Sequence, residues 1–175
     1  MKRNPMLAIG LALAFALAAG GAQAQNKTAD KASQKFISNA IEGNYAEIEV
    51  GKLAQEKGKS DAVKQFGQML VTDHSAANET AKQVASEIGV KPPTGASVGE
   101  KATYLRLKML SGDTFDRAFA RAMVSDHKSD IKAFQKETTK NDPAGEFAKQ
   151  TLPTLQKHLQ SAQQLQQKSQ TTGSK

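Results

Sequence analysis

The sequence predicts an all-α protein, an up-down four-helix bundle with a long crossover that carries a short extra helix between the second and third helices. Three observations support this prediction. Apolar residues recur at alternating spacings of three and four, the period of an amphipathic helix. Short runs of Gly, Pro, Ser and Asp separate these segments. One pattern, Phe66–His74 (FGQMLVTDH), returns as Phe119–His127 (FARAMVSDH), with Phe, Val, Asp and His at the same offsets.

The first residues have the composition of a secretory signal peptide. Two basic residues open the chain, an apolar run follows, and Ala22-Gln23-Ala24 is a small-x-small cleavage pattern. Cleavage after Ala24 makes Gln25 the first mature residue, and we expect a periplasmic or secreted protein. The apolar run is too short and too rich in Ala and Gly to cross a membrane, so we expect no transmembrane span in the mature protein.

Composition excludes several classes of function. The chain has no Cys, which excludes disulfides, thiolate metal sites and cysteine nucleophiles. Without the signal peptide, 22 basic residues face 17 acidic ones, and the net charge falls from +7 to +5. These charges are spread along the chain without an arginine cluster or interleaved aromatic residues, so we expect no nucleic-acid partner. We expect a monomer or weak dimer, with an envelope component or another protein as partner.

The chain divides into four parts by composition. We predict a signal peptide over residues 1–24, a flexible N-terminus over 25–33, one bundle domain over 34–167 and a disordered tail over 168–175. The length left after the signal peptide suits one domain with a sizeable core.

The first helix is predicted from about Asp30 to Lys57. One side of it consists mostly of small residues, which allow a neighbouring helix to come close. Glu47 lies at the centre of this side. A carboxylate there is costly to bury unless it is paired, protonated or bound to a metal ion. Glu47 is therefore the first candidate site residue.

The second helix is predicted from a Ser60 cap to about residue 88, where Gly89 ends it. His74 lies within its apolar stripe, and Asp73 lies at the edge of that stripe. The following segment 90–96 (VKPPTGA) is not helical, because its consecutive prolines force an extended path.

A short helix over residues 97–110 completes the predicted crossover, and the third main helix runs from about 113 to 140. Asp126 and His127 flank the middle of its apolar side. The last helix starts at Pro143 and runs to about residue 167, with His158 at the edge of its apolar stripe.

Helix lengths place Glu47 and the three histidines at one level. At about 1.5 Å per residue, Glu47 lies roughly 18 Å before the first turn and His74 roughly 22 Å after it. His127 and His158 lie at nearly equal distances from the turn that joins their helices. The long crossover makes the second and third helices parallel, so all four groups are expected within about one turn of each other.

Two interpretations of this layer stay open. In the first, the histidines form an interior polar network with Glu47, Asp73 and Asp126 that fixes helix register, in an envelope-associated binding or stress-related protein. In the second, the layer holds one divalent metal ion of the zinc type, and the aspartates orient the ligands. The ligands would be Glu47, His74, His127 and His158.

Catalysis is the third class, and we do not expect it. No nucleophile or acid–base pair stands out in the sequence. A hydrolase acting through a metal-bound water would need an open coordination position and a pocket that reaches solvent.

Five segments carry a resemblance to a known family: AEIEVGKLA around Glu47, FGQMLVTDH, GDTFDRAF, MVSDH and LPTLQKHL. Together they resemble a bacterial family of secreted proteins of unknown function, commonly described as periplasmic or outer-membrane proteins. The resemblance covers nearly all of the mature chain. It implies a ferritin-like four-helix bundle and no established activity.

A di-iron site of the ferritin type does not fit this sequence. Such sites use a Glu on two helices and Glu-x-x-His on the other two. The positions three before the histidines hold Val71, Val124 and Leu155 instead. The bridging carboxylates are missing, so redox di-iron chemistry is not expected.

Overall fold

The computed structural model describes residues 29–171, and over this range the chain is all-α, with five helices and no strand. The predicted signal peptide, most of the predicted flexible N-terminus and residues 172–175 lie outside the described residues. The predicted tail is helical as far as Thr171. The helices are α1 (Lys31–Lys57), α2 (Asp61–Glu87), α3 (Val98–Lys108), α4 (Gly112–Glu137) and α5 (Pro143–Thr171).

Local sequence sets the ends of these helices. The side chains of Asp30, Ser60 and Ser97 each accept a hydrogen bond from a backbone N–H in the first turn of α1, α2 and α3. In α3 the Glu100 carboxylate accepts a bond from the Ser97 N–H in return, at 2.7 Å, which completes a capping box. Gly89 follows α2 with a φ of 73°, a conformation that glycine adopts without strain.

Helix α1 begins inside the segment 25–33 that we expected to be flexible. Asp30 forms an ion pair with Lys140, which lies in the turn between α4 and α5. Ser33 is fully buried, and its hydroxyl donates to Asp142 Oδ2 at 2.8 Å. These partners lie more than a hundred positions away in the sequence, so the polar composition of the segment gave no sign of them. Tertiary contacts order this first turn.

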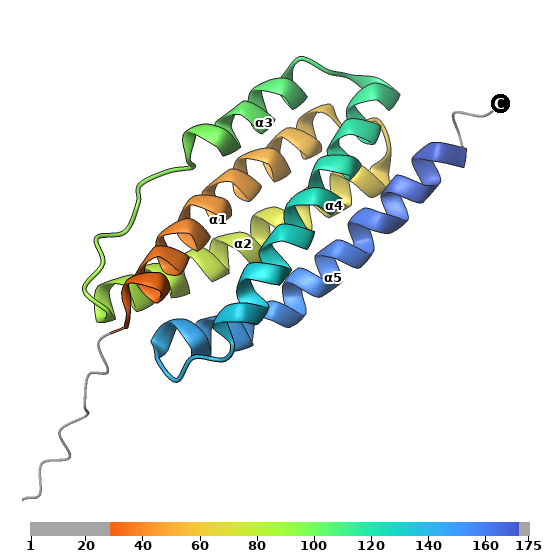
Figure 1. Ribbon diagram of the computed structural model, residues 1–175. Coiled ribbons are helices and arrows are strands. Elements are labelled where there is room, and N and C mark those ends of the chain that lie inside the picture. Colours follow the sequence, from red (N-terminus) through yellow and green to blue (C-terminus); the bar gives the residue numbers. More distant parts are fainter. Residues whose placement is uncertain (1–28, 172–175) are drawn as a thin grey trace, which may run out of the picture.

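The long helices pack as two antiparallel pairs, α1 with α2 and α4 with α5, and α2 also packs against α5 (Figure 1). The connection after α2 carries the chain back along the bundle before α4 begins, so α2 and α4 run in the same direction. Helix α3 lies along α1 and also contacts α4. It therefore covers the seam between α1 and α4.

A polar layer divides the core of this helical bundle into two apolar clusters, one toward each end. On α1, Ile37 and Ile41 belong to one cluster and Val50 to the other. Between them the same helix buries Asn44 and Glu47. On each of the other three long helices, the interruption contains a buried histidine. The polar side chains of four helices thus share one level.

Helices α1 and α2 come close because two glycines face each other. A Cβ atom on Gly51 would lie 2.7 Å from the carbonyl oxygen of Gly67, and one on Gly67 would lie 2.6 Å from that of Gly51. Neither position has room for a side chain. This close approach brings the middle of α1 against α2 just before the polar layer.

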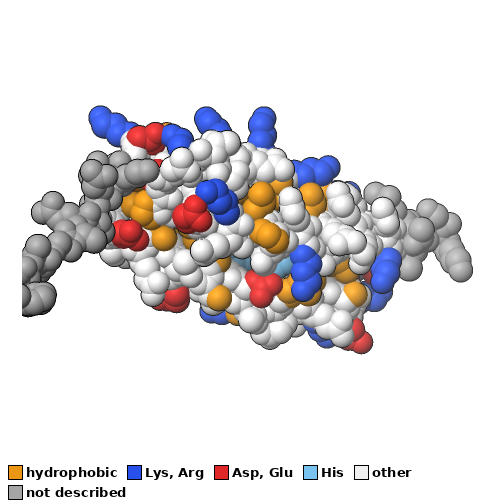
Figure 2. Space-filling model, turned by 90° about the horizontal axis from the view of Figure 1, so that it is seen from below, with side chains coloured by type: hydrophobic (Ala, Val, Ile, Leu, Met, Phe, Trp, Pro, Cys, Tyr) orange, Lys and Arg blue, Asp and Glu red, His pale blue; other side chains and the backbone are white. Residues whose placement is uncertain are grey.

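The surface carries both signs of charge. On the face shown in Figure 2, Lys and Arg side chains and Asp and Glu side chains are scattered among neutral and hydrophobic groups, and several Lys and Arg side chains stand along the upper edge. Within the described part of the chain, no helix is both long enough and apolar enough to cross a bilayer.

Candidate metal centre

Three histidines from three helices meet in the polar layer. His74 on α2, His127 on α4 and His158 on α5 are all buried, with exposed fractions of 4%, 0% and 0%. Their ring centroids lie 5.3 to 5.8 Å apart. One nitrogen of each ring lies within 4.8 Å of the corresponding nitrogens of the other two. The fold thus gathers all the histidines of the chain in one place.

One nitrogen of each ring is hydrogen-bonded to an oxygen that can only accept. His74 Nδ1 lies 2.9 Å from Asn44 Oδ1, and His127 Nδ1 lies 3.0 Å from the Met123 carbonyl oxygen. His158 Nε2 lies 2.8 Å from Asp73 Oδ2. Each of these nitrogens must carry the proton that it donates.

The remaining nitrogens therefore present lone pairs. His127 Nε2 and His158 Nδ1 lie 3.3 Å apart. His74 Nε2 is buried without a hydrogen-bond partner. In a neutral imidazole only one nitrogen carries a proton, so these three inner nitrogens are acceptors without a donor between them. Such a set is arranged as metal ligands are, with each outer nitrogen held by a hydrogen bond.

Burial keeps the three rings neutral. It lowers the pKa of His127 from 6.5 to about 4, with a smaller contribution from neighbouring His158. Burial also lowers the pKa of His74 well below its ordinary value. For His158 burial lowers the pKa as well, although the Asp73 carboxylate opposes the shift. Neutral imidazole is the form that binds metal ions.

Glu47 lies on the other side of His127. Its Oε1 is 3.8 Å from His127 Nδ1, and its Oε2 is buried without a hydrogen-bond partner. Burial, and then the charges of Asp130, Asp126 and Glu100, raise the pKa of Glu47 well above 4.5. The carboxyl therefore keeps its proton over a range in which an ordinary glutamate is ionised.

The structure places the predicted site residues in two groups. Among the described residues, the donor atoms within 4.8 Å of one another belong to the three histidines, and the carboxyl of Glu47 is not one of them. Glu47 instead approaches the outer nitrogen of His127. Asp73 is the hydrogen-bond partner of His158. Asp126 lines a cavity together with Glu47.

Sequence reasoning missed the partners of His74 and His127. Asn44 lies one helical turn before Glu47, on the same buried side of α1, and that position was the available signal. The Met123 carbonyl gives no signal, since every residue has one. Asp130 and Glu100 were also missed as neighbours of Glu47. Asp130 follows Asp126 by one turn and so shares its face.

Three imidazoles without a thiolate suit zinc, copper, nickel or iron ions. The positions three before each histidine, where a di-iron site would have Glu, hold hydrophobic residues. Two of these residues, Val124 and Leu155, are buried. No carboxylate from those positions can bridge two metal ions. If the three histidines hold a metal, the arrangement has room for one ion and not for a bridged pair.

The comparisons identify a family but no activity. A family model described as a domain of unknown function (DUF4142) matches residues 18–165. No curated protein matches the chain significantly. The fold is similar to the crystal structure of a DUF305 fragment from Deinococcus radiodurans, with a TM-score of 0.71 and 12% sequence identity. That likeness covers 80% of this chain and 98% of the other, and at this identity it concerns the fold alone.

Proposed function

Since the chain belongs to the DUF4142 family, a domain of unknown function, we propose from its geometry that it binds one divalent transition-metal ion of the zinc type. The ligands are His74, His127 and His158. The observation that carries this proposal is the set of three outer hydrogen bonds to Asn44, Met123 and Asp73. These bonds turn the free lone pairs of the three rings toward one another.

Two facing lone pairs need a cation between them. His127 Nε2 and His158 Nδ1 are 3.3 Å apart, and two nitrogens on a tetrahedral zinc ion lie about 3.3 Å apart when each bond is about 2.0–2.1 Å. A shared proton could also join the two nitrogens. Burial opposes that proton, because it lowers the pKa of both rings. Near neutral pH a metal ion is the cation that fits.

Three imidazoles leave a fourth position for water or for a carboxylate. Glu47 is the carboxylate that the sequence suggests, and it lies 3.8 Å from the outer nitrogen of His127. To become a ligand it would have to change rotamer and reach the inner side of that ring. A water molecule needs no such movement, so we propose three histidines plus water.

A cavity leads to the proposed site. It has a volume of about 520 Å³ and is lined by His74 and Asn44 at its buried end and by Asn39 and Ser129, which are exposed. His74 carries the one histidine nitrogen of the described residues that has no hydrogen-bond partner, so we propose this cavity as the route of a metal ion to the site. The same opening would admit a small ligand of the metal.

The fold details and location belong to the same proposal. We propose a ferritin-like up-down four-helix bundle, supported by the antiparallel pairs α1/α2 and α4/α5 and by the crossover that contains α3. We propose a periplasmic or secreted location, supported by the signal-like composition of residues 1–24, and a monomer or weak dimer. N-terminal sequencing of periplasmic protein tests this location, and the expected first residue is Gln25.

The test of metal binding compares the wild-type protein with histidine variants. Protein stripped with EDTA is titrated with Zn²⁺, Cu²⁺ and Fe²⁺ by calorimetry, and its thermal unfolding is followed in parallel. We expect one equivalent of one metal to bind and to stabilise the fold by about 3 kcal/mol at a hundredfold excess over the dissociation constant. His74→Gln and His158→Gln should lose this response.

Asn78→Ala is the matched control. Asn78 is buried on α2 one turn after His74, and its side-chain oxygen has no partner. Removing the Asn78 amide perturbs the same polar layer without removing a proposed metal ligand, so metal binding should persist. Circular dichroism of each apo variant shows whether it is folded. Equal metal responses in wild-type protein and histidine variants, or no response at all, would support the metal-free polar network of a binding or stress-related protein.

A further inference from the structure

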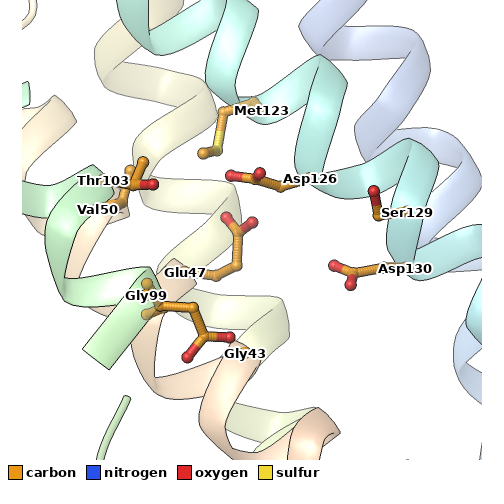
Figure 3. A pocket seen from close by; sticks show the side chains of 11 residues that line it. Gly43, Glu47, Val50, Gly99, Thr103, Met123, Asp126, Ser129 and Asp130 are labelled. Carbon is orange, nitrogen blue, oxygen red and sulfur yellow. The ribbon is translucent and has the colours of Figure 1, made fainter. Parts of the chain in front are cut away.

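A second polar cavity lies beside the candidate metal centre, among α1, α3 and α4 (Figure 3). Its volume is about 270 Å³. Four carboxylates line it, and the lining includes no Lys, Arg or His. They are Glu47, Glu100, Asp126 and Asp130. The first comes from α1, the second from α3 and the last two from α4, so the fold assembles this cluster from three separate helices.

The cluster stands out because the chain as a whole is basic, with a net charge of +7. Four carboxylates elsewhere have lysine partners, such as Asp113 with Lys59 at 2.7 Å. Among the ion pairs of the described residues, none involves Glu100, Asp126 or Asp130. The protein therefore leaves this cavity without a cationic side chain of its own.

Glu47 supplies independent evidence for a ligand. It is 5% exposed, and its Oε2 has no hydrogen-bond partner. Figure 3 shows its carboxyl extending into the cavity, toward the side chains of Asp126 and Asp130. Leaving a buried oxygen without a partner costs free energy, and native proteins seldom do so without a reason. A cation in the cavity would satisfy this oxygen.

The chemistry of the lining selects the kind of cation. Its charged donors are all carboxylate oxygens, and the hydroxyls of Thr103 and Ser129 lie in the same wall. Oxygen ligands suit hard cations such as Ca²⁺ and Mg²⁺, whereas imidazole suits zinc and copper. Ca²⁺ accepts irregular sets of oxygens and completes its shell with water, which the cavity has room for.

We propose that this cavity is a binding site for a hard divalent cation, Ca²⁺ above all, held by Glu47 from α1 and by Asp126 and Asp130 from α4. Asp126 and Asp130 are one helical turn apart and therefore present their carboxylates on one face. Glu100 keeps one oxygen on the Ser97 N–H for its capping box and adds negative charge from α3. The cation would bridge α1 and α4 at the seam that α3 covers.

The mutual repulsion of these groups agrees with this assignment. Burial raises the pKa of Asp130 to about 7, and the charges of Asp126 and Glu100 add to the shift. Without a cation, these carboxylates thus resist being ionised together. The site shares no ligand with the three histidines, so it goes beyond the proposed function and does not depend on it.

Glu47→Gln and Asp130→Asn test the site with nearly unchanged side-chain shape. EDTA-stripped protein is dialysed and titrated with CaCl₂ and, separately, with MgCl₂, by calorimetry and thermal unfolding. We expect Ca²⁺ to raise the melting temperature of the wild-type protein, and each variant to bind Ca²⁺ at least ~10-fold more weakly. Because both variants remove a crowded carboxyl, their melting temperatures without Ca²⁺ should equal or exceed that of wild type.

Glu49→Gln is the matched control, since Glu49 lies on the same helix but is exposed. It makes the same change in charge and should keep the full response to Ca²⁺. The His158→Gln variant should also keep it, which separates this site from the histidine centre. The proposal is overturned if Ca²⁺ up to about 10 mM has no effect on wild-type protein. It is also overturned if Glu47→Gln and Glu49→Gln respond alike, because that result would reflect charge screening.

Discussion

Asp73 Oδ2 and His158 Nε2 form a 2.8 Å hydrogen bond between α2 and α5. The carboxylate is about one-third exposed, whereas the imidazole is fully buried. The bond therefore reaches from the solvent side into the polar layer. Since the carboxylate can only accept, it places the proton on Nε2 and leaves Nδ1 to face His127.

Asp73→Asn is expected to weaken metal binding. The amide can turn its NH₂ group toward Nε2, which would move the proton to Nδ1 and block the inner nitrogen. Loss of such an orienting partner typically lowers metal affinity by about 10–100-fold. Calorimetric titration with Zn²⁺ measures this change. Glu87→Gln, an exposed carboxylate on the same helix, is the control and should bind as wild type does. Equal affinity in Asp73→Asn would show that this bond does not orient a ligand.

The stability of the metal-free protein should fall in acid because of His127. The pKa of this ring is 6.5 in the unfolded chain and about 4 in the folded one. Between these values the unfolded state binds more protons, so acidification favours unfolding. The penalty is absent above pH 6.5 and complete below about pH 4, where it reaches about 3 kcal/mol.

Urea unfolding in EDTA at several pH values between 7 and 4 checks this dependence. Other groups titrate in the same range, and burial shifts the pKa of Asp130 the opposite way. The informative quantity is therefore the difference in unfolding free energy between wild type and His127→Gln. That difference should shift in favour of the variant as the pH falls. A constant difference would mean that His127 has the same pKa in the folded and unfolded states.

Gly67→Ala should destabilise the fold by several kcal/mol. Its new methyl group would lie 2.6 Å from the carbonyl oxygen of Gly51, so α1 and α2 would have to move apart. Gly99→Ala is the matched control, because a Cβ there meets nothing within 4 Å. In α3 that change should be neutral or stabilising by up to about 1 kcal/mol. Chemical denaturation of both variants separates the two outcomes, and similar stabilities would contradict the close packing.

Asp30→Asn tests the contact that orders the start of α1. The hydrogen bond from Lys140, and then that from the Ser33 N–H, lower the pKa of Asp30 from 3.8 to about 2. Asparagine keeps the capping oxygen but loses the charge. The wild-type advantage should be present above pH 3.8 and disappear as the pH falls through about 2. Thermal melts at pH 6 and near pH 2 measure it, and an advantage that persists in strong acid would rule out the ion pair as its source.

Most of the fold could be read from local chemistry. The caps at Ser60 and Ser97 and the breaks at Gly89 and Pro143 mark helix ends that the structure has within a few residues. Their effect depends on neighbours one turn away, which the sequence displays directly. The start of α1 was the exception, because Lys140 and Asp142 order it from the turn between α4 and α5.

The candidate site was only partly readable. The sequence by itself determined that the three histidines enter the polar layer, since His74, His127 and His158 interrupt apolar helix faces at matching distances from the turns. Only the tertiary structure decided which way each group points. Helical period places a residue on a face, whereas the partner of each ring nitrogen lies on another helix or on the backbone. For that reason Glu47 could be recognised as buried, but its place among the carboxylates of α3 and α4 followed only from how the helices pack.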